Sequence, residues 1–280
     1  MLAAQVAEVV AGLPVGLLDL VQLAAQLPGL FADLGRGGAQ LLGLGPDGLQ
    51  AGARLFGLLL GGLQPAAVVG RELGGAGQRA LARVSVSARG SVVILEAETG
   101  SGKTEAALLH YLRLMQASRV DSMYFALPTR TAATQIQRRV VEAMRRAFPD
   151  SNSRPVTVLA VPGYIVADDA TATRLPNFQT LWNDEDAEQV RYRRWAAEQP
   201  KRYLAAAVAV GTIDQTLLSA LTVGHAHMRA TALLRSLLVV DEVHASDAYM
   251  TAILEQVLRR HVRAGGHALL MSATLGSSAR

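Results

Sequence analysis

Cysteine is absent from this 280-residue sequence. Without thiols the chain can form no disulfide and no thiolate zinc site, and no cysteine can act as a nucleophile. The first twenty residues contain Glu8 and Asp19 but no Lys or Arg, so the basic start of a secretory signal peptide is missing too. We therefore expect a cytoplasmic protein with no disulfide-linked partner.

Long uninterrupted hydrophobic runs are also lacking. The most membrane-like stretch, residues 55–70, contains Gln64 and Pro65 and is shorter than the roughly 20 residues that a helix needs to cross a bilayer. We expect no membrane association. Half of the residues are nevertheless hydrophobic and 18% are charged, which excludes global disorder. The net charge of +4 is compatible with a nucleic-acid partner but does not require one.

The composition changes near residue 80. Of the 26 glycines, 17 lie in residues 1–80, interleaved with Leu and Ala. We predict a small, mostly helical appendage there, although each glycine inside a helix costs about 1 kcal/mol relative to alanine. Residues 81–280 are predicted to form a second, larger domain.

Short apolar runs alternate with amphipathic segments from Ser91 onward. Runs that are apolar throughout are typical of parallel strands buried on both faces, and the segments between them supply the crossover helices that a parallel sheet needs. We predict a doubly wound α/β fold with a parallel sheet. The predicted strands are 92–95, 123–127, 156–159, 207–210, 237–240 and 268–271, and the predicted helices are 103–117, 131–148, 214–221 and 249–264.

Residues 163–202 interrupt this alternation. The segment is too long for a plain connection, so we predict an insertion with structure of its own.

A glycine-rich loop lies between the first predicted strand and the first predicted helix. In this context glycines let backbone N–H groups converge on phosphates, and the helix N-terminus adds the positive end of its dipole. Lys103 is predicted to reach the β- and γ-phosphates of ATP, and the Thr104 hydroxyl to bind Mg²⁺. The alternative is an ordinary turn before a helix. The predicted nucleotide-binding residues are Thr99, Gly100, Ser101, Gly102, Lys103 and Thr104.

An acidic pair, Asp241 and Glu242, follows the apolar run 237–240. Asp241 is predicted to hold Mg²⁺, and Glu242 to polarise the water that attacks ATP. His244 would then sense the γ-phosphate. Such a pair alone is often a solvated loop start, so the prediction depends on its combination with the phosphate loop.

Three further motifs also follow predicted strands. Ser272, Ala273 and Thr274 are predicted to relay hydrolysis to the nucleic-acid path. The other two motifs are predicted to contact the phosphates of a nucleic acid, with helix capping by Thr129 and Asp214 as the alternative. Their residues are Pro128, Thr129, Arg130, Gly211 and Thr212.

These motifs, in this order, resemble those of superfamily 2 helicases. The stretches 98–108, 210–215 and 241–250 are more particularly similar to the type I CRISPR-associated helicase–nuclease, over roughly residues 78–280. The resemblance implies a RecA-like ATP-binding domain. It also implies recruitment by an RNA-guided surveillance complex, 3′-to-5′ translocation along displaced single-stranded DNA, and degradation of that strand by an HD nuclease domain.

Two features of that family do not occur in this sequence. None of its six histidines is followed by aspartate, and only six residues follow Thr274, so we expect the HD nuclease and the second RecA-like domain to lie outside it. Because arginines of the second domain complete such ATP sites, we expect this chain to bind ATP but to hydrolyse it poorly. Two alternatives stay open: a DExH helicase of DNA repair or RNA metabolism, and a truncated nucleic-acid-binding module without turnover.

Some residues outside the motifs have less certain roles. Gln78 lies where such helicases often place a glutamine that reads adenine, but a surface helix is the alternative. His225 and His227 have no third metal ligand nearby and are predicted to lie in a polar loop. The clusters 191–195 and 201–202 could stack on single-stranded DNA or form a solvated charged face.

Overall fold

The structure, a computed structural model, describes residues 76–87, 89–98, 100–176, 179–184, 193–242 and 248–273. Almost all of the helical appendage predicted for residues 1–80 lies outside these described residues. Thr99, His244 and Thr274 of the predicted motifs lie outside them as well.

The strands of the described residues form a nine-stranded sheet in the order β1-β9-β8-β2-β7-β3-β4-β5-β6. The first six strands in this order pair in parallel throughout. All six correspond to predicted strands, with ends that differ by at most two residues. They are β1 (Ser91–Glu96), β2 (Ser122–Leu127), β3 (Thr157–Ala160), β7 (Val208–Thr212), β8 (Ser236–Val240) and β9 (His267–Ser272).

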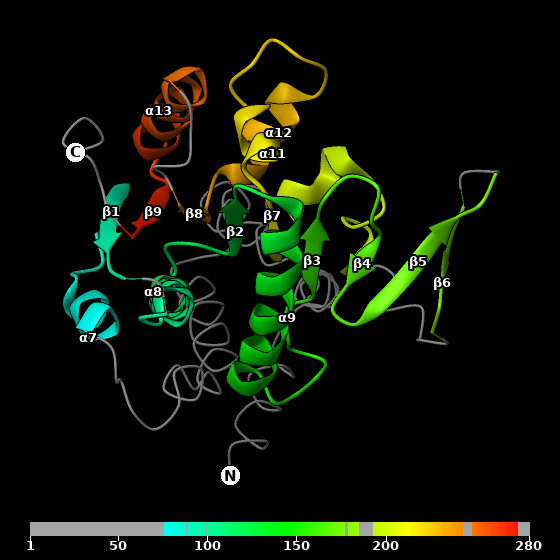
Figure 1. Ribbon diagram of the computed structural model, residues 1–280, viewed down its shortest axis with the longest axis horizontal. Helices are drawn as coiled ribbons and strands as arrows, with labels where there is room; N and C mark the ends of the chain where they lie inside the picture. The colour runs from blue at the N-terminus through cyan, green and yellow to red at the C-terminus, as the bar shows by residue number, and fades with distance from the viewer. Residues whose placement is uncertain are drawn as a thin grey trace, which may run out of the picture. The chain divides into compact units, whose positions relative to one another are not determined.

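The helices cover both faces of this sheet. Figure 1 shows α7, α8 and α9 on one side and α11, α12 and α13 on the other. The chain steps from β1 to β2 to β3 in one direction and returns from β7 to β8 to β9 in the other, so right-handed crossovers place the two sets on opposite faces. The doubly wound prediction is confirmed. The helices are α7 (Ala76–Arg83), α8 (Lys103–Gln116), α9 (Arg130–Ala147), the 3₁₀ helix η2 (Pro200–Ala205), α11 (Ile213–Leu217), α12 (Ala226–Leu233) and α13 (Ala248–Arg263).

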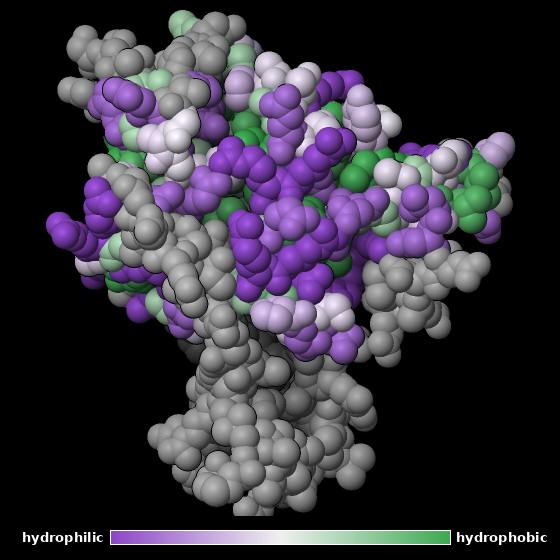
Figure 2. Space-filling view, turned by 60° about the horizontal axis from the view of Figure 1, so that its bottom comes forward, coloured by the Kyte–Doolittle hydropathy of each residue, from purple (hydrophilic) through white to green (hydrophobic). Residues whose placement is uncertain are grey.

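Burial explains why these strands are apolar on both faces. Every residue of β3, β7 and β8 is buried, because each strand lies inside the sheet, between two neighbouring strands, and helices cover both faces. The helices are amphipathic: α9 buries Val140 and Met144 and exposes Arg138, Arg139 and Arg146. Figure 2 shows hydrophilic side chains over the middle of the face on which α9 lies. None of the helices in the described part of the chain is long and apolar enough to cross a membrane.

The segment 163–202, for which an insertion is predicted, adds antiparallel strands to the parallel sheet. Three further strands, β4 (Val166–Ala167), β5 (Ala170–Arg174) and β6 (Thr180–Trp182), extend it antiparallel beyond β3. Asp168 turns the chain between β4 and β5 with a φ of 52°, and its Oδ1 accepts a hydrogen bond of 2.8 Å from the Thr157 N–H. The described part of the segment 163–202 is therefore a hairpin extension of the sheet, followed by η2.

The histidine pair is placed differently from the prediction. His225 is the N-cap of α12 and His227 lies inside this helix, so the two do not share a polar loop. In the described residues, no group of three His, Cys, Asp or Glu side chains is arranged to hold a metal ion.

Candidate nucleotide-binding site

Three predicted motifs meet at the carboxyl edge of the parallel sheet. β1 leads into the phosphate loop, β8 ends directly before Asp241, and β9 ends at Ser272. Backbone hydrogen bonds fix these strand ends to their neighbours: the Ala97 N–H donates to the Ser272 carbonyl at 3.1 Å, and the Asp241 N–H to the Ala126 carbonyl at 2.9 Å. Parallel pairing thus brings together residues that are far apart in the sequence.

The phosphate loop depends on two glycines with left-handed backbone conformations. Gly100 and Gly102 both have a φ of 82°, which other residues rarely adopt. A Cβ at Gly102 would also lie 2.4 Å from the Gln78 Nε2, whereas a Cβ at Gly100 would meet nothing within 4 Å. Ser101 closes the turn, since its Oγ donates to the Glu98 carbonyl at 2.6 Å.

The first turn of α8 is open to an anion. Its N-cap, Gly102, provides no side-chain hydrogen bond to the helix, so no side chain caps the N–H groups of this turn. A helix N-terminus of this kind is favourable for phosphate, because the N–H groups and the helix dipole both attract negative charge.

Lys103 connects the phosphate loop with the acidic pair. Its Nζ donates a 2.9 Å hydrogen bond to the Ala97 carbonyl and lies 3.9 Å from the Glu242 Oε1. The Lys103 side chain is only 9% exposed. A buried ammonium needs such partners, because an isolated charge away from water is costly. The first residue of α8 therefore faces the loop after β8.

The acidic pair has a constrained backbone. Glu242 has a φ of 54°, a conformation that costs a non-glycine residue roughly 1–2 kcal/mol. Its N–H donates to the Asp241 Oδ1 at 3.0 Å, which holds the two residues in one tight turn. The buried Thr104 hydroxyl and the Asp241 carboxylate are both oxygen ligands, and Mg²⁺ prefers oxygen ligands. These residue types fit the ion that the sequence predicts.

Gln78 lies against the phosphate loop. It is on α7, is 7% exposed, and its Nε2 donates to the Gly102 carbonyl at 3.4 Å. Its Oε1 is buried without a hydrogen-bond partner among the described residues. The buried position of Gln78 argues against a solvent-exposed helix surface.

The two predicted phosphate-contacting motifs lie at the carboxyl ends of β2 and β7, which are neighbours in the sheet: the first follows β2, and the second forms the last two residues of β7. Pro128, Thr129 and Arg130 are exposed, and the Thr129 Oγ1 also caps α9 by accepting from the Ala132 N–H at 3.2 Å. Gly211 and Thr212 are buried.

Capping by Asp214 was the alternative for the loop after β7, and it is wrong. Thr212 is the N-cap of α11, and Asp214 lies in the first turn of this helix.

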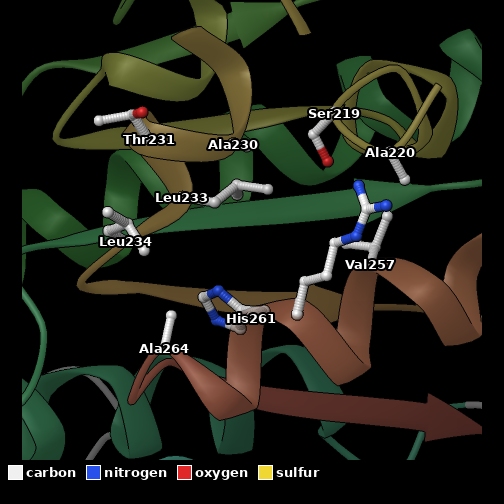
Figure 3. A pocket seen from close by; sticks show the side chains of 10 residues that line it. Ser219, Ala220, Ala230, Thr231, Leu233, Leu234, Val257, His261 and Ala264 are labelled. Atoms are coloured by element: carbon white, nitrogen blue, oxygen red, sulfur yellow. The ribbon is translucent and has the colours of Figure 1, made fainter. Parts of the chain in front are cut away.

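A cavity of about 230 Å³ lies elsewhere, between α12, α13 and the turn after α11. Figure 3 shows His261 and Leu233 among the side chains that line it. Arg260 also lines this cavity. No predicted site residue lines this cavity, so the candidate site is the open carboxyl edge of the sheet.

Comparisons with known proteins agree with this geometry. Residues 77–163 match the DEAD/DEAH box helicase family. Over 190 residues the chain is 36% identical to the CRISPR-associated endonuclease/helicase Cas3 of Escherichia coli (strain K12), which covers 66% of this chain and 20% of that protein. The corresponding protein of Thermus thermophilus is 33% identical over 193 residues, covering 68% and 20%. The crystal structure of T. fusca Cas3 with ATP matches with a TM-score of 0.59 at 30% identity, over 77% of this chain and 23% of that one.

Fold, site and family match together define the class: the chain contains the RecA-like domain of a DEAD/DEAH-box helicase, a class of ATP-hydrolysing enzymes. Within this class, the chain is homologous to the motor portion of the CRISPR-associated Cas3 proteins. It spans about a fifth of the length of the curated relatives that it matches.

Proposed function

We propose that this chain is the ATP-binding half of an ATP- and Mg²⁺-dependent motor that moves along single-stranded DNA exposed by an RNA-guided complex. One observation carries the proposal. Lys103, at the start of α8, lies between the Ala97 carbonyl of the phosphate loop and the Glu242 carboxylate after β8. A phosphate-binding group and a candidate base thus meet at one point.

Different residues at this edge bind the nucleotide and promote its hydrolysis. Lys103 and the N–H groups of the loop bind the phosphates, and the Gln78 Oε1 accepts a hydrogen bond from the amino group of adenine. Thr104 and Asp241 would hold Mg²⁺, and the ion would supply positive charge that neutralises the phosphates. Glu242 orients the attacking water and accepts its proton.

The residues proposed to couple ATP hydrolysis to nucleic-acid binding lie at the ends of strands. The Ser272 carbonyl accepts a hydrogen bond from the Ala97 N–H, so the end of β9 is joined directly to the phosphate loop. We propose that Ser272 and Ala273 transmit the state of the nucleotide, together with His244 and Thr274, for which the proposal rests on sequence alone. The loops after β2 and β7 contact the nucleic-acid backbone through Pro128, Thr129, Arg130, Gly211 and Thr212.

The partners of the whole protein are part of the proposal. The Cas3 relatives carry the name endonuclease/helicase, and this chain spans a fifth of them. We propose that a second RecA-like domain completes the ATP site with arginines, which in related motors are worth roughly 10³–10⁵ in rate. The described residues should therefore bind ATP well and hydrolyse it slowly unless this second domain is supplied.

ATP turnover tests this proposal. We expect little ATPase activity from the chain alone, and a rise when a second motor domain and single-stranded DNA are added. Stronger stimulation by single-stranded RNA would favour a helicase of RNA metabolism. Bound nucleic acid without turnover, even with the second domain, would favour a binding module.

A further inference from the structure

Exposed aromatic side chains are few in this chain, in which only 5% of the residues are aromatic. Tyr164 and Trp195 are 49% and 40% exposed. An exposed ring of this size loses the benefit of burial, so a pair of them in one region suggests a contact surface. Both belong to the part of the chain between β3 and β7.

Tyr164 is presented by a rigid turn at the carboxyl end of β3. Gly163 allows this turn with a φ of 94°, and the Tyr164 N–H donates to the Val161 carbonyl at 3.1 Å. The hydroxyl of the buried Tyr203 supports this turn. Its one proton is shared between the carbonyls of Val161 and Tyr164, at 3.2 and 3.4 Å. A ring on a fixed turn loses little conformational entropy when a ligand binds.

This turn lies on the same edge as the proposed phosphate-contacting loops. β2, β7 and β3 are successive parallel neighbours, so the loops after them emerge side by side. Tyr164 thus continues the row formed by Pro128–Arg130 after β2 and Gly211–Thr212 at the end of β7. A single-stranded nucleic acid that crosses these two motifs would reach Tyr164 next.

Two guanidinium groups act on the Tyr203 hydroxyl, which supports the Tyr164 turn. Burial raises the pKa of the Tyr203 hydroxyl to about 12, and the charges that oppose this shift are the guanidinium groups of Arg174 and Arg130. Arg174 lies two residues beyond Ala172, whose N–H donates to the Ile165 carbonyl. Arg174 therefore lies on the strand whose backbone is bonded to the residue after Tyr164, and its charge acts on the Tyr203 hydroxyl.

Arg174 also joins this region to Trp195. Its guanidinium donates to the Glu198 carbonyl, in the turn that carries Trp195. Arg202 lies over the Trp195 ring, 5.2 Å from its centroid, and pairs with Glu198 at 3.9 Å. Arg174, Glu198 and Arg202 thus link the surroundings of the Tyr203 hydroxyl to Trp195, with Glu198 as a partly compensating charge.

We propose that Tyr164 and Trp195 stack on bases of single-stranded nucleic acid that leaves the loops after β2 and β7, while Arg130, Arg174 and Arg202 face its phosphates. This inference rests on the proposed function, since it extends the same nucleic-acid path. Rings offer a π-face that every base can use, and basic side chains beside them attract the backbone without reading sequence. The site therefore holds the strand irrespective of its sequence.

The test is binding of the full chain to fluorescent oligothymidylate and to the same oligonucleotide with abasic sites, measured by anisotropy. Tyr164→Ala and Trp195→Ala should each weaken binding to oligothymidylate roughly 5- to 100-fold, while Tyr164→Phe and Trp195→Phe bind as the unmodified chain does. Tyr249→Ala, which removes an exposed ring on α13, is the matched control and should change nothing.

The abasic oligonucleotide separates stacking from charge. It should bind more weakly than oligothymidylate to the unmodified chain, and the alanine variants should bind it no worse than the unmodified chain does. Arg130→Ala should weaken both oligonucleotides equally. An alanine variant that loses affinity equally for both, or loses none, overturns the stacking role.

If the unmodified chain binds no single-stranded DNA, the proposed function itself fails, and a surface for an acidic protein becomes the better explanation. Matched thermal unfolding shows that the variants are folded.

Discussion

At the scale of single residues, Gln78 connects α7 to the phosphate loop. Its Nε2 is bound to the Gly102 carbonyl, while its Oε1 is buried and has no hydrogen-bond partner in the described part of the chain. A buried acceptor without a partner costs free energy that a ligand can recover. The adenine amino group is a suitable donor, and guanine has a carbonyl at the same position.

Replacement of Gln78 by alanine tests this role through nucleotide selectivity. We expect Gln78→Ala to weaken ATP binding roughly 2- to 10-fold, the usual worth of one hydrogen bond, and to leave GTP binding nearly unchanged. Calorimetric titration with both nucleotides measures the difference. Equal losses for ATP and GTP would show that Gln78 only supports Gly102.

His110 makes stability depend on pH. It is 2% exposed on α8, and neither ring nitrogen has a hydrogen-bond partner among the residues that the structure describes. Burial, with smaller effects from the charges of Arg113 and His267, lowers its pKa from 6.5 to about 4. The folded-state pKa of His110 lies below its unfolded value, so protonation favours the unfolded state. The full free energy of unfolding is therefore present above pH 6.5, and part of it is lost as the pH falls toward 4.

We expect the titration of His110 to lower the free energy of unfolding by about 2 kcal/mol between neutral pH and a pH of about 5. His110→Leu should be folded at neutral pH, since it removes no hydrogen bond, and should lose less stability on acidification. Thermal unfolding of both proteins at the two pH values measures this. Parallel pH profiles would contradict the assignment to His110.

At the scale of secondary structure, the pairing of β7 with β3 requires a glycine. A Cβ at Gly211 would lie 2.3 Å from the Ala160 carbonyl oxygen and 2.6 Å from the Tyr124 hydroxyl. The backbone oxygen of a paired strand cannot move away easily, so the strands would have to separate. The loop after β7, which is proposed to contact the nucleic acid, would then shift as well.

Gly211→Ala should therefore destabilise the protein by about 1–3 kcal/mol or more. Gly224→Ala is the matched control, because a Cβ there meets nothing within 4 Å, and its effect should stay within about 0.5 kcal/mol. Urea unfolding of the two variants gives the comparison. Equal stability of both would mean that β7 and β3 pair less closely than described.

Local patterns in the sequence predicted the six parallel strands well, because buried parallel strands are apolar throughout. They missed β5, whose Ala170–Arg174 sequence is rich in threonine and largely exposed. They also missed α12, and they extended α11 to residue 221 although it ends at Leu217. These elements depend on contacts with distant segments more than on their own pattern.

The same distinction applies to the site. The approach of Lys103 to Glu242 follows from strand ends that share one edge, so the motifs alone could predict it. The support that Tyr203 gives to the Tyr164 turn could not be predicted, since it depends on a hydroxyl reaching two carbonyls about 40 residues away. No local signal marks such a contact.

At the scale of the whole molecule, two groups of residues occupy different parts of one edge. The nucleotide-binding residues lie at β1, β8 and β9, and the proposed nucleic-acid contacts lie at β2, β7 and β3. β8 and β2 are direct neighbours, so only one strand pair separates the acidic pair from the proposed nucleic-acid contacts. This arrangement suits a motor in which nucleotide state controls the grip on a strand.

The central claim is that Lys103 binds the phosphates of ATP, and a titration of the chain with ATP in the presence of Mg²⁺ tests it most directly. Lys103→Ala should bind ATP roughly 10- to 100-fold more weakly, since a charged hydrogen bond to phosphate is lost. Lys201→Ala, which removes the other lysine of the sequence, should bind ATP as the unmodified chain does. Unchanged ATP affinity in Lys103→Ala would contradict the account.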